Sequence, residues 1–325
     1  MLLTSICTRL VAIDLKVATE APQGSPWDNA LRELAGTWSK ISNGEVRLKI
    51  YAGGIVGDEP DMLRKIRIGQ LDGAALSQLA LASILPEIMA ISTPYLVRTI
   101  EEFRYLVEAL TPEYERRLLE RGLVAISWAE GGWAHFFAVD PIAQPSDLAR
   151  LRLAVPAGDD EMLQIWRRLG YSAFPLSLTE YAMGLQTGMV EAFYAPPAAV
   201  AAFGWFGRIS YMNAVPIAPV IGAVVLTLEA WDSISEEHRA GFLESAHAIG
   251  RTLTEASIDV EQEAIDVMIE EGIKVVESQL PDEWWELGIS GAELARGRLF
   301  SFEEYEKVVS LLESYRRVVA PVETD

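Results

Sequence analysis

Apolar residues switch several times between two-residue spacing and three- to four-residue spacing along the first eighty positions. This pattern predicts strands at 15–19, 45–51 and 72–77, with helices at 27–41 and 58–68 between them. The Asn43-Gly44 pair marks the end of the first helix. Strands and helices that alternate through short loops are typical of a parallel sheet covered by helices.

The same alternation starts again near residue 140. Here the spacing predicts strands at 151–155, 174–176 and 190–194, and helices at 159–169 and 181–187. Ser177 with Glu180 three residues later forms a capping box ahead of the second of these helices. We therefore predict two α/β domains, each with a mixed, mostly parallel sheet flanked by helices.

A long helix is predicted after both domains. From 235 to 271 the chain has no proline, and its apolar positions recur at three- and four-residue steps. Such a helix is roughly 55 Å long, which exceeds one small domain, so we expect it to span both. A short apolar segment at 273–276 and a helix at 303–317 follow.

These elements predict the domain boundaries. Domain I comprises 14–138 and about 223–250, domain II comprises 139–222 and about 251–300, and the C-terminal segment 301–325 packs back on the domains as a helix. The chain then crosses between domains near 135–140 and 220–225, where we expect a hinge.

Charge and cysteine content exclude several classes of protein. The chain has 325 residues with 27 Lys and Arg against 47 Asp and Glu, a net charge of −20, which argues against a nucleic-acid partner. Cys7 is the only cysteine, so an intrachain disulfide and a cysteine-based metal cluster are excluded. No apolar run reaches the roughly 18 residues that a membrane-spanning helix needs.

The first residues leave the export route open. They contain a short apolar stretch without the pattern of an intact signal peptide. Cys7 follows Leu3-Thr4-Ser5-Ile6, which loosely resembles a lipoprotein sequence. Two interpretations therefore stand: a lipid-anchored or processed leader, or an ordinary segment ahead of the first strand.

Few residues offer catalytic chemistry. His135, His238 and His247 lack a metal-binding spacing, and the common nucleophile, zinc and phosphate-loop motifs are absent from the sequence. We therefore predict no enzymatic activity, no metal and no cofactor. The alternative, an enzyme, would rely on His135, Glu59 and Glu191 as acid/base groups, without an accompanying nucleophile.

Aromatic and small polar residues instead gather where strands end. Ligands of open α/β sheets bind beyond the carboxyl ends of the strands, and two facing sheets form a cleft there. We predict that aromatic side chains stack on a ligand in this cleft: Trp27, Trp133, Phe174, Phe193 and Tyr194. The predicted polar contacts are Ser77, Gln78, Glu59 and Tyr211.

Two segments carry a resemblance to a known family. They are PQGSPWDNALRELAGTWSKISNGEVRLKIYAGGIVGDEPDMLRKIRIGQLDG near the N-terminus and LSLTEYAMGLQTGMVEAFYAPP in the second half. Together with the long helix, they resemble the extracytoplasmic solute-binding proteins of tripartite ATP-independent periplasmic (TRAP) transporters, over about 14–317.

The resemblance implies a two-domain fold of the periplasmic-binding-protein type. It also implies a periplasmic or otherwise extracytoplasmic receptor that closes on a small molecule and delivers it to membrane permease subunits, without a chemical step. In some systems of this kind a helical-repeat (TPR) partner protein accompanies the receptor.

One departure from the family bears on the ligand. The family commonly clamps a carboxylate with an arginine in a strand resembling G-L-K-I-R-V-P, and that position falls on Ala154 in Arg150–Pro156. A carboxylate buried without its guanidinium costs several kcal/mol. The departure therefore predicts a ligand that is apolar, aromatic, or polar without a clamped carboxylate.

Two alternatives remain. Arg152 lies on the same strand face as Ala154, so it would replace the family arginine in a receptor for ordinary organic acids. The chain would otherwise be a ligand-sensing module that signals to a partner instead of a permease.

Overall fold

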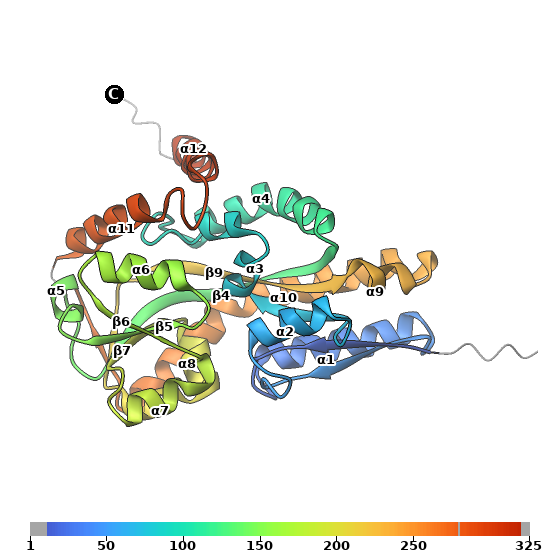
Figure 1. Cartoon of the computed structure of the whole chain (residues 1–325), viewed down its shortest axis with the longest axis horizontal. Helices are drawn as coiled ribbons and strands as arrows, with labels where there is room; N and C mark the ends of the chain where they lie inside the picture. Colours follow the sequence, from blue (N-terminus) through green and yellow to red (C-terminus); the bar gives the residue numbers. More distant parts are fainter. Residues whose placement is uncertain (1–11, 279, 320–325) are drawn as a thin grey trace, which may run out of the picture.

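The computed structural model describes residues 12–278 and 280–319, and its strands form one hydrogen-bonded network with two halves (Figure 1). The strands are β1 Ile13–Ala18, β2 Val46–Tyr51, β3 Gly73–Ser77, β4 Leu123–Ala138, β5 Arg152–Pro156, β6 Ser172–Leu176, β7 Ala192–Ala195, β8 Tyr211–Asn213, β9 Ala218–Thr227 and β10 Lys274–Val276. The first half has the order β2-β1-β3-β9-β4 and the second continues as β4-β7-β5-β6.

Helices cover both halves. The α-helices are α1 Pro26–Ile41, α2 Glu59–Arg67, α3 Gln78–Ala82, α4 Ile100–Glu120, α5 Pro145–Leu148, α6 Asp160–Arg168, α7 Tyr181–Gln186, α8 Pro197–Phe203, α9 Leu228–Ser233, α10 Glu236–Glu270, α11 Pro281–Ala295 and α12 Phe302–Val319. Short 3₁₀ helices are η1 Pro86–Ala90, η2 Leu178–Glu180 and η3 Trp205–Arg208. In Figure 1 the blue helices α1 and α2 lie at one end and the green-yellow helices α6, α7 and α8 at the other.

The strand pairing confirms the predicted mixed α/β fold. β1 runs parallel to β2 and β3, and β5 runs parallel to β6 and β7. β9 is antiparallel to β3 and β4, and β4 is also antiparallel to β7. The parallel strands thus lie on the outer sides of each half, while β4 and β9 carry the chain between the halves.

The predicted long helix is α10, a 35-residue helix from Glu236 to Glu270. It contacts α1 in the first half, α8 in the second and β4 between them, so it spans both halves as expected. Ser127 Oγ on β4 donates a hydrogen bond to the Ala246 carbonyl of the helix at 2.9 Å. The helix is therefore fastened to the strand that links the two halves.

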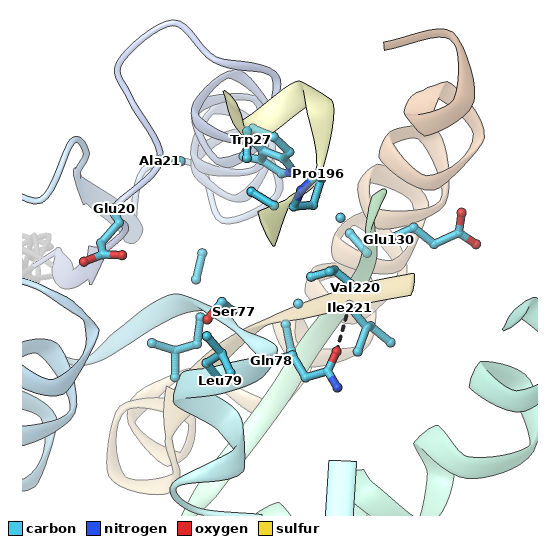
Figure 2. A pocket seen from close by; sticks show the side chains of 18 of the residues that line it. Glu20, Ala21, Trp27, Ser77, Gln78, Leu79, Glu130, Pro196, Val220 and Ile221 are labelled. Atoms are coloured by element: carbon cyan, nitrogen blue, oxygen red, sulfur yellow. Dashed lines mark hydrogen bonds between the residues drawn. The ribbon is translucent and has the colours of Figure 1, made fainter. Parts of the chain in front are cut away.

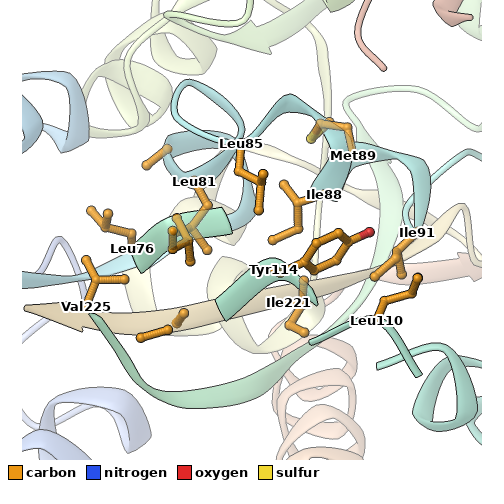
Figure 3. Close-up of a cluster of buried hydrophobic side chains, with 14 of the residues drawn as sticks. Leu76, Leu81, Leu85, Ile88, Met89, Ile91, Leu110, Tyr114, Ile221 and Val225 are labelled. Atoms are coloured by element: carbon orange, nitrogen blue, oxygen red, sulfur yellow. The ribbon is translucent and has the colours of Figure 1, made fainter. Parts of the chain in front are cut away.

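The main core lies against β3, β9 and α4. Leu76 and Leu81 pack with Ile88 and Ile221, and Figure 3 shows these side chains around Tyr114 of α4. Leu76 and Ile221 belong to the strands that also line the cavity described below. The same packing that stabilises the first half thus supports the cavity floor.

Several elements were not predicted from the spacing, among them helix α4 and the linking strands β4 and β9. Helix α4 has Pro112 in its interior yet buries one face, including Phe103, Leu110 and Leu118. Strand β4 has two register irregularities against β9, one between Ala125 and Ser127 and one between Glu130 and Trp133. Bulges bend a strand. The irregularity between Glu130 and Trp133 lies where β4 passes between the halves.

The domain boundaries, the two chain ends and a membrane-spanning helix were also subjects of prediction. The exact domain boundaries remain a prediction, although β4 and β9 carry the chain close to the predicted crossings. Cys7 and residues 320–325 lie outside the described residues. Within the described ranges, we find no helix long and apolar enough to cross a membrane.

Candidate functional site

A cavity of about 370 Å³ lies between the two halves of the fold. From the first half come residues at the ends of β1 and β3 and on α1 and α2, and from the second half come the ends of β5 and β7, the start of α6, and α8. β4, β9 and α10 contribute the remaining wall. Its size falls within the usual range for small-ligand sites.

Aromatic side chains from both halves line this cavity. Trp27 lies in the first turn of α1, whose N-cap Ser25 accepts a hydrogen bond from the Asp28 amide at 3.3 Å. Tyr194 and Trp166 lie in the second half, with ring centroids 6.0 Å apart. The rest of the lining is mainly apolar. Figure 2 shows Pro196 beside Trp27, with Leu79 and Val220 across the cavity from it.

Glu59 and Ser77 form a partly buried polar pair at the cavity. The Ser77 amide donates to Glu59 Oε1 and the Ser77 hydroxyl to Glu59 Oε2, both at 2.5 Å. Burial raises the pKa of Glu59, while these two hydrogen bonds oppose the rise. The pair joins the start of α2 to the end of β3.

Gln78 also lines the cavity, but the protein itself uses its amide. Its Nε2 donates to the Ile88 carbonyl at 3.1 Å, and its Oε1 accepts from Ser92 Oγ at 2.7 Å and from the Ile221 amide at 3.3 Å. Figure 2 shows the bond to Ile221 as a dashed line. Gln78 therefore connects α3 and η1 to β9.

Three acidic residues that line the cavity were missed as ligand contacts: Glu20, Asp159 and Glu130. Glu20 follows β1, and burial together with the neighbouring carboxylates Glu59 and Asp58 raises its pKa to about 8. Asp159 is the N-cap of α6, where its Oδ1 accepts from the Met162 amide at 3.1 Å. The sequence signal for Glu20 was its place directly after a strand.

Asp159 has a second, unused oxygen. Its Oδ2 is buried and has no hydrogen-bond partner within the described residues. Burial raises the pKa of Asp159 to about 6. The structure thus gives this carboxylate both a capping role and a position in the cavity wall.

The charge of the cavity wall is one-sided. Among the described residues that line it, none is arginine, lysine or histidine. Glu130 is the one lining acid with a basic partner in that part of the chain, Arg104, at 2.9 Å. Figure 2 shows the Glu130 carboxylate turned away from Trp27 and Ser77.

The structure brings together five of the residues predicted as ligand contacts. Those that line the cavity are Trp27, Glu59, Ser77, Gln78 and Tyr194. Ala154 and Phe193 instead are fully buried in a separate core cluster, and Phe174 packs against that cluster. The period-two pattern of strands gives the spacing of side chains but not which face of a strand meets the other half.

Three other predicted contacts also lie outside the cavity lining. Arg152 forms an ion pair with Glu191 at 2.8 Å and donates to the Gly188 carbonyl at 2.6 Å. The Trp133 amide donates to Glu261 Oε1 at 2.9 Å. Tyr211 lies on β8, between β4 and β10. Arg152 and Ala154 of β5, both predicted as ligand contacts, therefore lie outside the cavity lining.

A two-lobed α/β fold with a mostly apolar cavity between its lobes is the architecture of a solute-binding protein. Residues 17–285 match the family described as bacterial extracellular solute-binding protein, family 7. The chain belongs to this family. It is accordingly an extracytoplasmic, periplasmic solute-binding protein of the TRAP transporter type.

The curated relatives have low sequence identity to this chain but match it over most of their length. A solute-binding protein of Chromohalobacter salexigens is 23% identical over 79% of this chain and 76% of its own length. The sialic acid-binding periplasmic protein SiaP of Vibrio cholerae is 22% identical over 81% of this chain and 83% of its own.

Solved structures share the fold. A TRAP periplasmic solute-binding protein of Chromohalobacter salexigens with bound D-glucuronate superposes with a TM-score of 0.83 at 19% identity, covering 92% of this chain and 99% of that chain. One from Desulfovibrio salexigens with bound orotic acid gives a TM-score of 0.83 at 18% identity, covering 94% and 99%.

The acidic cavity predicts that the unliganded protein loses stability as the pH rises. Glu20 has a raised folded-state pKa of about 8, so its contribution is fully present below the ordinary glutamate range and is lost as the pH rises through 8. We expect a lower urea midpoint at pH 9 than at pH 6. In Glu20→Gln this difference shrinks, whereas Glu33→Gln, an exposed change on α1, leaves it unchanged. An equal pH dependence in wild type and Glu20→Gln would contradict the prediction.

Proposed function

We propose that this protein captures a small organic ligand in the cavity between its halves and delivers it to TRAP-type membrane permease subunits. The observation that carries the proposal is the cavity itself, lined from both halves in a chain of a solute-binding family. A ligand that contacts both halves stabilises the closed arrangement over the open one, because it binds the closed form better.

The proposed ligand is apolar or aromatic, or polar without a clamped carboxylate. The described lining offers tryptophan and tyrosine rings and no arginine or lysine. The solved neighbours named above hold glucuronate and orotic acid, both of which are carboxylic acids. Binding a carboxylate here would place it beside Glu20 and Glu59 without a cation, which is electrostatically unfavourable. The organic-acid alternative requires Arg152, whose guanidinium is held by Glu191 and Gly188.

Closure is proposed to bend the chain where β4 and β9 pass between the halves. The bulge between Glu130 and Trp133 includes Gly132, which has a φ of +88°. Glu261 of α10 holds the Trp133 amide at this point. A hinge there would let the halves move while α10 stays attached to both.

We further propose that the protein has no enzymatic activity. The acid/base candidates do not converge: His135 Nδ1 lies 3.0 Å from the Asn213 carbonyl, Glu191 pairs with Arg152, and Glu59 lies in the cavity. Transport receptors of the family have no chemical step to perform. The helical-repeat partner protein remains a prediction, and so does the ligand-sensing module. Uptake that depends on this protein would favour the transport receptor over the sensing module.

Native mass spectrometry tests the proposal. We expect a 1:1 complex with a small compound that denaturation releases unchanged. Trp27→Ala is expected to weaken rebinding of that compound at least tenfold, because it removes stacking area from the cavity wall. Trp285→Ala is the matched control, since Trp285 packs under Arg98, outside the cavity lining. Turnover of the compound, or equal loss in both variants, would contradict the receptor function.

A further inference from the structure

Three carboxylates from the two halves line the same cavity. Glu20 and Glu59 come from the first half, and burial and proximity to Glu59 both oppose ionisation of Glu20. Asp159 comes from the second half. A methyl group on Gly158 would lie 3.6 Å from Pro60 Cγ, so the loop before Asp159 comes close to the start of α2, where Glu59 lies. The segment that carries Asp159 therefore approaches the segment of the other half that carries Glu59.

These carboxylates have no ion-pair partner among the residues that the structure describes. Salt bridges there neutralise many other acids, including the buried Glu130 through Arg104, but none of them involves Glu20, Glu59 or Asp159. Asp159 Oδ2 is also a buried acceptor without a donor in that part of the chain. A buried acceptor of this kind is unfavourable unless something binds to it.

The surrounding wall would accommodate the remainder of such a ligand. Trp27 and Leu31 of the first half, with Trp166 and Tyr194 of the second, supply apolar and aromatic area next to the acids. Aromatic faces also attract cations.

We propose that the cavity takes a small organic cation whose charged nitrogen binds between Glu20 and Glu59 of one half and Asp159 of the other, with its apolar body against the aromatic wall. This inference rests on the proposed receptor function and names its ligand class. A cation that contacts acids of both halves binds the closed form better than the open one, so its binding favours closure of the halves.

Matched probes that differ in one group test the ligand class. Binding of 2-phenylethylammonium, 2-phenylethanol and 3-phenylpropanoate to protein stripped of carried compounds is measured by calorimetry, together with the benzylammonium, benzyl alcohol and phenylacetate series. We expect the ammonium member of a series to bind at least tenfold more tightly than its alcohol and the carboxylate member to bind most weakly.

Two variants locate the nitrogen. Glu20→Gln and Asp159→Asn are each expected to weaken ammonium binding at least tenfold and to leave alcohol binding nearly unchanged. Asparagine also caps helices well, so Asp159→Asn keeps the start of α6. The controls are Glu33→Gln and Asp160→Asn, exposed changes of equal charge outside the cavity lining, and both are expected to bind like wild type.

The outcomes separate this inference from the receptor function. Tighter binding of the carboxylate or alcohol member, or release of an anionic compound from the purified protein, would overturn the cation and leave a receptor. Ammonium binding that is equally weakened by the controls would reduce it to a general charge effect and also overturn it. Failure of every probe, with no carried compound on native mass spectrometry, would count against both.

Discussion

Ala154→Arg is expected to lower the free energy of unfolding by about 3–5 kcal/mol, the typical cost of an uncompensated buried charge. Ala154 is fully buried and clusters with Phe137, Leu176 and Phe193. That cluster consists of apolar and aromatic side chains, so a guanidinium there would lose its water in mainly apolar surroundings. The measurement is the urea midpoint of the variant against wild type.

Ala154→Met is the control for side-chain size. It is expected to cost about 1–3 kcal/mol through overpacking alone. An Ala154→Arg protein that kept the wild-type midpoint and bound D-galacturonate would contradict the prediction. That result would mean that the side chain at 154 reaches the cavity and that the family arginine can be restored there.

Gly250→Ala is expected to destabilise the protein by about 2 kcal/mol, although alanine is the better helix former. Gly250 lies inside α10 where the helix crosses β4, and a Cβ there would meet the Trp128 carbonyl oxygen at 2.6 Å as well as Ser127 Oγ. The helix must move away from the strand, which weakens the packing that joins the two halves.

Gly36→Ala provides the matched comparison. Gly36 is also inside a helix, α1, but a Cβ there would meet nothing within 4 Å. It is expected to stabilise the protein by about 0.5–1 kcal/mol. Thermal unfolding of both variants measures the difference. A stabilised Gly250→Ala would show that α10 does not pack as closely on β4 as the contacts at Gly250 imply.

Local patterns predicted most of the elements because they depend on neighbours along the chain. The predicted helix at 27–41 is α1, Pro26–Ile41, and the predicted strand at 45–51 is β2, Val46–Tyr51. The long proline-free segment is α10. Helix α4 and strand β4 were not predicted, for the same reason. Pro112 and the Gly131-Gly132 pair interrupt the local signal, and burial against the rest of the fold overrides it.

Site residues were predicted less well because the choice among strand-end residues is a long-range matter. Trp27 and Tyr194 line the cavity, while Phe193, next to Tyr194, lies in the core. Adjacent strand residues point to opposite faces, and the sequence does not state which face meets the other half. Asp159 also combines a local capping role with a position in the cavity, and only the local role is visible in the sequence.

The sequence by itself determined the class of fold, the family and the acidic character of this protein, because these follow from periodicity, motif order and composition. Only the tertiary structure decided which residues line the cavity, since that depends on how β4, β9 and α10 set one half against the other. It also showed that Glu20, Glu59 and Asp159, far apart in sequence, line the same cavity without a basic partner among the described residues. The electrostatic character of the site arises from that juxtaposition, because Coulomb interactions depend on distance in space and on burial.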